Sequence, residues 1–280
     1  MNLIEPQGRL AERGNIRFRA ANMAEFTGFD PDHFAFFREL ERHNNREWFL
    51  ENRARYDAVV ATFRALLGRL EEPMLRLNRH FDVAGKVNGN FSRINRDIRF
   101  QRDRAPYNTN YYLFFYDRRR GRKNDGRFYA AVSDEGFTTG FSIYDSGEGA
   151  VRNVLRPRLA RHYETLRHWL AGHVAGRRGY DCYWYRRVRK GGRQSWEHGT
   201  GLPRTAADWE TMGGLVVRKF IRPVHPALGR AAIAHEIELT FERLYPLYAF
   251  TSMEGPGWRK HLAMGPPSRT PRGRRASPRV

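Results

Sequence analysis

Apolar residues recur at helical spacing early in the chain. Between Tyr56 and Leu70 they follow one another at intervals of three and four positions, which predicts a helix with one continuous buried face. We expect this helix to open near Arg46 and to kink or end at Pro73, because proline lacks the N–H that an interior helical position donates. The same spacing predicts helices over residues 150–170 and 226–245.

An earlier helix is indicated by its capping residues. Asp30 can accept hydrogen bonds from the backbone of a first turn, and Pro31 has the fixed φ that suits the first helical position. This helix is expected to run to about His43 and to stop at Asn44 and Asn45. One of these asparagines is expected to adopt left-handed φ and then to cap the next helix.

From Val87 onward the apolar pattern becomes strand-like. Strands are predicted at residues 91–94, 111–116, 128–132, 137–144, 180–188 and 215–221, with a short helix at 206–212. The run at 111–116, YYLFFY, has the aromatic content and the length of a buried strand. Strands that follow one another without intervening helices favour an α+β fold, in which an antiparallel sheet is flanked by helices.

A single α+β domain is expected to occupy residues 23–264. Residues 1–22 lack a periodic apolar face and residues 265–280 lack aromatic side chains, so both ends are expected to be disordered. The pattern of the fold begins three residues after Met23. We therefore expect Met23 to be the initiator and residues 1–22 to be a dispensable upstream extension.

Basic charge is spread over the whole chain. The net charge is +20, of which residues 1–22 carry +2 and residues 265–280 carry +5, so +13 remains on the body. A field of this sign attracts polyanions. Arginine far outnumbers lysine, which is also what a GC-rich genome produces, so the excess of arginine by itself does not indicate a function.

Several classes of site and location are disfavoured by the sequence. Cys182 is the only cysteine, which rules out an intrachain disulfide or a cysteine-based zinc site and suits a reducing compartment. No apolar run reaches the roughly 20 residues of a membrane span, and residues 1–22 lack the apolar core of a signal peptide. No metal-ligand spacing, Walker loop or GxGxxG motif is present. We expect a cytoplasmic protein without a metal, a cofactor or a membrane partner.

Five arginines and two aspartates crowd into the first twelve residues of the segment 93–108, RINRDIRFQRDRAPYN. Guanidinium groups at this density either pair with carboxylates to fix a loop or converge on an anion from outside the chain. In the anion-binding interpretation, Asp97 braces the guanidinium planes and Tyr107 is a hydrogen-bond donor or a stacking surface. The anion contacts would then be Arg93, Arg96, Arg99 and Arg104.

This segment resembles the signature RxxRDxRFxxxKxPYK of a bacterial family of conserved hypothetical proteins that carries a domain of unknown function. The matching positions are Arg93, Arg96, Asp97, Arg99, Phe100, Pro106 and Tyr107. Arg104 and Asn108 stand where the family has lysine, so charge is kept at the first position and lost at the second. The segments FTGF at 26–29 and NNREWF at 44–49 also resemble the opening helices of that family, and the resemblance covers residues 23–145 well. The family has no established activity, so the resemblance implies no reaction.

Two further segments are candidates for a role in binding. Arg46 and Glu47 lie in what is most simply a corner between two helices, but their charges could brace the arginine motif. The segment at 180–196, YDCYWYRRVRKGGRQSW, interleaves aromatic and basic residues. Single-strand nucleic-acid surfaces use this pattern, and an edge strand with buried rings and solvated arginines produces the same letters.

The sequence favours binding of an anionic ligand, either a phosphorylated small molecule or a nucleic acid, at the arginine-rich loop. One alternative is an enzyme for a phosphorylated or sugar substrate, with Asp97 or Asp103 as acid or base. The other is a scaffold in which the arginines and aspartates form a salt-bridge network.

Overall fold

The computed structural model describes residues 24–97, 105–174, 179–190 and 193–264. Its helices are α2 (Pro31–Arg42), α3 (Arg46–Glu51), α4 (Arg53–Leu77), the π-helical turn η1 (Val151–Leu155), α5 (Arg156–His173), α6 (Ala206–Glu210), α7 (Ile233–Ser252) and α8 (Trp258–Met264). Its strands are β1 (Asn110–Phe115), β2 (Arg127–Ser133), β3 (Phe137–Tyr144), β4 (Tyr180–Lys190), β5 (Arg193–Thr200) and β6 (Gly214–Ile221). The two ends that were expected to be disordered lie outside the described residues.

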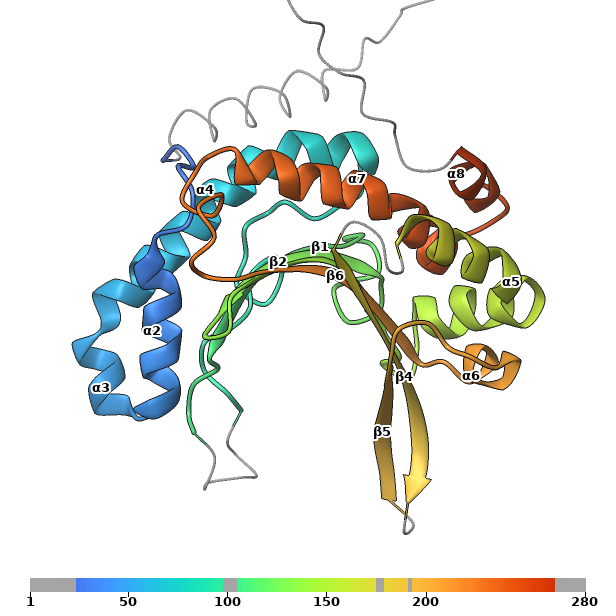
Figure 1. Cartoon of the computed structure of the whole chain (residues 1–280), viewed down its shortest axis with the longest axis horizontal. Helices are drawn as coiled ribbons and strands as arrows, with labels where there is room; N and C mark the ends of the chain where they lie inside the picture. The colour runs from blue at the N-terminus through green and yellow to red at the C-terminus, as the bar shows by residue number, and fades with distance from the viewer. Residues whose placement is uncertain (1–23, 98–104, 175–178, 191–192, 265–280) are drawn as a thin grey trace, which may run out of the picture.

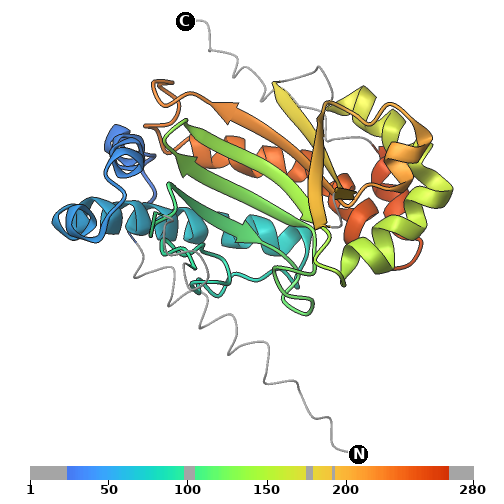
Figure 2. The same cartoon turned by 90° about the horizontal axis from the view of Figure 1, so that it is seen from below.

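The strands form one antiparallel sheet in the order β1-β2-β3-β6-β4-β5. Figure 1 shows the sheet as an arch, with α4 and α7 across its convex face, α2 and α3 beyond one end, and α5 and α6 at the other. Seen from below in Figure 2, the strands lie in front of α4 and α7. This arrangement confirms the expected α+β fold. No helix in the described part of the chain is long and apolar enough to cross a membrane.

The core lies between the convex face of the sheet and the two long helices. Tyr111 on β1 meets Phe63 of α4 with ring centroids 5.2 Å apart, and Phe128 on β2 meets Phe241 of α7 at the same separation. All four of these rings are buried. Side chains alternate along a strand. The neighbours of Tyr111 in β1 and of Phe128 in β2 therefore point to the concave face.

The predicted start of α2 is confirmed. Asp30 is its N-cap and accepts a hydrogen bond from Asp32 N at 2.7 Å, and Pro31 is its first residue. The helix expected from near Arg46 is instead two helices, α3 and α4, separated at Asn52. The second continues through Pro73, which is buried, and ends at Leu77. Of the two outcomes expected at Pro73, a kink or an end, the end is therefore wrong.

Two strand predictions also need correction. Residues 91–94 form only isolated bridges, because the side chain of Asn90 takes the place of a ladder there: its Nδ2 donates to Asp82 O at 2.6 Å and to Phe114 O at 2.9 Å. Strand β5 was not predicted as a separate strand. Its sequence, RQSWEHGT, lacks the alternating apolar residues of a half-buried strand, and β5 lies at the edge of the sheet.

Candidate functional site

The predicted anion contacts fall in different surroundings. Arg93 is exposed and lines a hollow of about 490 Å³, which we call the cationic hollow; its other lining residues are Asn88, Arg120, Gly121, Arg122, Lys123 and Asn124. Arg96 holds its own loop, since its Nε donates to Asn108 Oδ1 at 3.3 Å and its N–H to Pro106 O at 2.8 Å. Arg99 and Arg104 lie outside the described residues.

Tyr107 is fixed by the corner between α2 and α3. Its ring stacks on Phe49 with centroids 4.1 Å apart, and the residue is 8% exposed. The side chain of Asn44 accepts from Tyr107 N and donates to Tyr107 O, both at 3.0 Å. Asn44 thus joins the two parts of the chain that resemble the family, a role that the sequence analysis missed.

The other residues of that corner have simpler roles. Asn45 caps α3 by accepting from Trp48 N at 3.0 Å, as expected of one of the two asparagines, but its φ of −135° is extended rather than left-handed. Within the described residues, neither Arg46 nor Glu47 makes an ion pair. Bracing by these two residues and by Asp97 stays a prediction.

A large set of convergent polar side chains lies on the concave face of the sheet. We call this site the basin; it encloses about 440 Å³. Alternation along the strands brings to it Tyr112 and Phe114 of β1, Arg127 and Tyr129 of β2, Ser142 and Tyr144 of β3, Tyr183 and Tyr185 of β4, His198 of β5, and Val216 and Arg218 of β6. The basin is therefore assembled from all six strands.

Small residues hollow out the centre of the basin. Gly140 lies between Tyr129 of β2 and Arg218 of β6 in the register of the sheet. A Cβ atom at this position would come within 2.1 Å of Val217 O, so only glycine fits. Gly214 lies likewise between Tyr144 and Tyr185. Both glycines thus stand beside side chains that line the basin, at positions where the backbone packs too closely for a Cβ atom.

Arg127 is a partly buried cation that has no carboxylate partner among the described residues. Its Nη1 donates to Arg122 O at 3.0 Å and its Nε to Ser142 Oγ at 3.3 Å. Its guanidinium lies 5.2 Å from the ring centroid of Phe114 and 5.5 Å from that of Tyr144. Burial lowers the pKa of Arg127, but a guanidinium remains charged in proteins. Of its five N–H donors, these contacts use only two.

Arg218 is only weakly neutralised. Its Nη2 donates to the Tyr183 hydroxyl at 3.3 Å, and its guanidinium lies 4.9 Å from the Tyr183 ring centroid. The nearest carboxylate oxygen, Asp181 Oδ2, is 3.9 Å from Nε, which is buried and makes no hydrogen bond. The basin therefore holds two cations with donors to spare.

Three tyrosines of the basin are held in the protonated form. Burial raises the pKa of Tyr112, Tyr129 and Tyr144, and neighbouring tyrosines raise it further. Their hydroxyls can therefore donate hydrogen bonds at any physiological pH. In the part of the chain that the structure describes, no aspartate or glutamate lines the basin. The lining thus offers donors and positive charge, which suits recognition of an anion and offers no carboxylate for acid–base chemistry.

The basic and aromatic segment on β4 and β5 divides between two faces. Tyr183 and Tyr185 face the basin, and Arg187 and Trp196, which are opposite one another in the register, lie on the same face by alternation. Trp196 is 45% exposed, and the guanidinium of Arg187 lies 5.0 Å from its ring centroid. Arg186 is paired with Glu197 and Asp208 at 3.0 Å each. The side chains of Arg189, Lys190 and Arg193 lie outside the description.

Comparison with known families decides the relationship of the chain. The model of a family of conserved hypothetical proteins, DUF2461, matches residues 32–198. The chain belongs to this family. The match extends past residues 23–145, which the motif resemblance covers well, and it contains β1 to β3 and therefore Arg127. No curated protein and no solved structure matches the chain.

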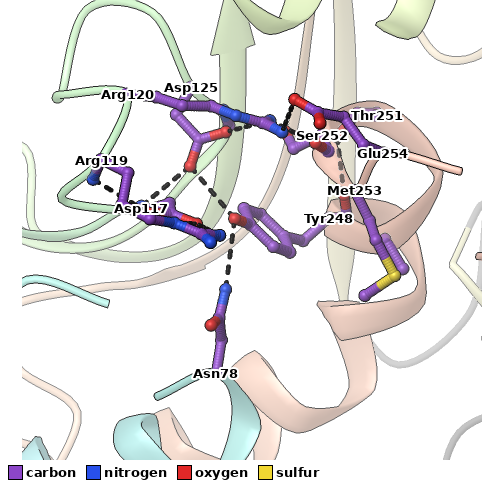
Figure 3. Close-up of polar contacts among 12 residues, drawn as sticks. Asn78, Asp117, Arg119, Arg120, Asp125, Tyr248, Thr251, Ser252, Met253 and Glu254 are labelled. Carbon is purple, nitrogen blue, oxygen red and sulfur yellow. Dashed lines mark hydrogen bonds and ion pairs between the residues drawn. The ribbon is translucent and has the colours of Figure 1, made fainter. Parts of the chain in front are cut away.

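A buried network that the sequence analysis missed holds the loop between β1 and β2 in this family member. Figure 3 shows the carboxylate of Asp125 between Arg120 and Tyr248. Asp125 accepts from Asp117 N at 2.8 Å, from the Tyr248 hydroxyl at 3.1 Å and from Arg120 Nη1 at 3.3 Å. Arg120 also donates to Ser252 O and pairs with Glu254 at 2.8 Å. These contacts tie the loop to the end of α7.

The described residues contain no cluster of three or more metal-ligating side chains. The aspartates of the network are taken up by hydrogen bonds within the chain. Burial raises the pKa of Asp117, but the hydrogen bonds and charge of Arg119 outweigh it and hold the pKa below its usual range. The network is thus a structural support for the loop that carries Arg122 and leads into Arg127.

Proposed function

We propose that this protein binds an anionic ligand in the basin, with Arg127 and Arg218 as the anion contacts and the tyrosine hydroxyls as further donors. The observation that carries the proposal is Arg127, whose charge no carboxylate in the described part of the chain compensates. A buried, uncompensated charge is costly for folding, and an anionic ligand offsets that cost. The partly exposed rings of Tyr112, Tyr144 and Tyr185 favour a ligand that also has a flat apolar part.

The arginine-rich loop takes two roles in this proposal. Arg93 supports anion binding, because it lies in the cationic hollow beside Arg122 and Lys123. Arg96 and Tyr107 support the scaffold alternative for their part of the loop, because their contacts fasten it to Asn108 and Asn44. The enzymatic alternative, with Asp97 or Asp103 as acid or base, gains no support from the basin.

The test is calorimetric titration with inorganic phosphate and with phenyl phosphate. Loss of one charge-assisted contact weakens binding by about 1.5–3 kcal/mol, so Arg127→Gln should lower the affinity for phenyl phosphate roughly 10- to 100-fold. Arg161→Gln, which removes an exposed arginine from α5, is the control with the same change in charge and should bind like the parent.

A second variant with a smaller change keeps the test valid if Arg127→Gln does not fold. Tyr144→Phe removes one hydroxyl and keeps the ring, and we expect it to weaken binding about 3- to 10-fold. Phenyl phosphate should also bind more tightly than inorganic phosphate, because of the aromatic walls. The proposal fails if the parent protein binds neither ligand at millimolar concentration, or if a folded Arg127→Gln variant binds as well as the parent.

A further inference from the structure

The basin and the cationic hollow are neighbours that share an aromatic wall. The ring of Phe114, which lines the basin, has the guanidinium of Arg127 at 5.2 Å and that of Arg122 at 5.1 Å from its centroid. Arg122 lines the cationic hollow, and its carbonyl oxygen accepts from Arg127 Nη1. A ligand can therefore reach from one hollow to the other by passing a single ring.

The cations of the cationic hollow are also largely uncompensated. Among the described residues, no carboxylate lines it. Arg120 is paired with Asp125 and Glu254, but Arg93 and Lys123 are exposed, and neither makes an ion pair within the described residues. Burial lowers the pKa of Arg122, Tyr116 raises it and the charge of Arg93 lowers it, as expected of the repulsion between two like charges that line one hollow. An anion placed among them would relieve that repulsion.

The two hollows together define the chemistry of the ligand. A molecule that fills both must carry at least two anionic groups on a connection that bends around Phe114. The stacked pair Tyr112 and Phe114, whose planes differ by 3°, and the partly exposed Tyr144 and Tyr185 offer flat surfaces beside the cations. Repeating phosphates with a flat ring between them are the composition of a nucleic-acid strand.

We infer that the basin and the cationic hollow together bind single-stranded nucleic acid. Arg127, Arg93 and Lys123 each contact one of its successive phosphates, and a base stacks on the tyrosines of the basin. A duplex keeps its bases inside the stack, where these rings do not reach them. The inference rests on the proposed function of the basin and adds to it the class of ligand and a second contact region.

The test is fluorescence anisotropy with labelled oligothymidylate on the full chain, with thymidine 5′-monophosphate and a duplex of equal length as competitors. We expect a hexamer to bind at least 10-fold more tightly than the mononucleotide and than the duplex. The variant Arg93→Gln/Lys123→Gln should weaken hexamer binding about 10-fold and leave the affinity for the mononucleotide within twofold. It should also reduce the slope of log affinity against log salt by about 1.4, since each phosphate contact contributes roughly 0.7 for a single strand.

The control is Arg161→Gln/Lys260→Gln, which removes one exposed arginine and one exposed lysine from α5 and α8. If both double variants bind the hexamer equally well, the inference is overturned. Binding of the strand by the basic ends of the chain would give that result. Absence of any gain from mononucleotide to hexamer would also overturn it. In either case, the proposal for the basin still holds if the parent binds the mononucleotide and Arg127→Gln abolishes that binding. If the protein binds no phosphate ligand, both the proposed function and this inference fail.

Discussion

Replacing Asp125 with an uncharged residue should stabilise the protein more at neutral pH than at acid pH, when each variant is compared with the parent at the same pH. Asp125 is 3% exposed and lies in the network of Figure 3. Burial raises its pKa to about 6, against the pull of the Asp117 N–H, the charge of Arg120 and the Tyr248 hydroxyl, while the charge of Asp117 raises it further. Asparagine at this position keeps an oxygen that can accept from the Asp117 N–H and from the Tyr248 hydroxyl, and it cannot ionise.

The sign follows from proton linkage. The folded protein holds the proton of Asp125 up to about pH 6, whereas the unfolded chain releases it near 3.8. The contribution of this group to stability is therefore complete below pH 3.8 and is lost as the pH rises through 6. A shift of about two units corresponds to about 3 kcal/mol, and about 2 kcal/mol of this falls between pH 4.5 and pH 8.

The assay is urea and thermal denaturation of the parent and of Asp125→Asn across that range. The stability difference between them should move by about 2 kcal/mol in favour of the variant from pH 4.5 to pH 8, or about 4–8 °C in Tm for a chain of this size. Glu72→Gln, at a carboxylate that is 85% exposed on α4, is the control for loss of a surface charge. A difference that is independent of pH, or that moves against the variant, would show that the ion pair with Arg120 outweighs burial.

Two further predictions concern groups outside the proposed site. Arg158 donates to four carbonyl oxygens at the end of α7, those of Ala249, Phe250, Met253 and Gly255. Arg158→Ala should therefore lower the free energy of unfolding by about 2–3 kcal/mol in chemical denaturation. Arg161→Ala on the same helix should lower it by less than about 0.5 kcal/mol. Burial raises the pKa of Cys182 to about 12, so its thiol should resist a disulfide reagent at pH 8 and react on unfolding; rapid labelling of the native protein would contradict this.

The elements that the sequence predicted well are those with a local signal. The start of α2 follows from Asp30 and Pro31, and the β1–β2–β3 meander follows from short apolar runs separated by turns. The break at Asn52 was missed because the apolar spacing continues across it. Strand β5 was missed because an edge strand requires few apolar residues.

The basin could not be predicted in the same way, because it depends on register between distant strands. The position of Gly140 between Tyr129 and Arg218 requires β6 to insert between β3 and β4, although β4 and β5 precede it in the chain. Alternation along each strand places Tyr112, Arg127 and Tyr144 on a face of their own strand, but not on a common floor. The link from Asn44 to Tyr107 is nonlocal in the same sense, since it spans 63 positions.

The density of arginine in this chain is a poor guide to where an anion would bind, and the partners of each arginine are a better one. Arg55 pairs with Asp32 at 2.6 Å and Glu39 at 2.7 Å, and Arg120 with Asp125 and Glu254, so these cations are already neutralised. Arg127 follows the basic turn at residues 117–126 and lies outside the motif at 93–108, yet in the described part of the chain it meets only a hydroxyl, a carbonyl oxygen and aromatic rings. Uncompensated charge in a hollow site is what an external anion can stabilise. This is why the basin, rather than the arginine motif at residues 93–108, is the centre of the proposed function.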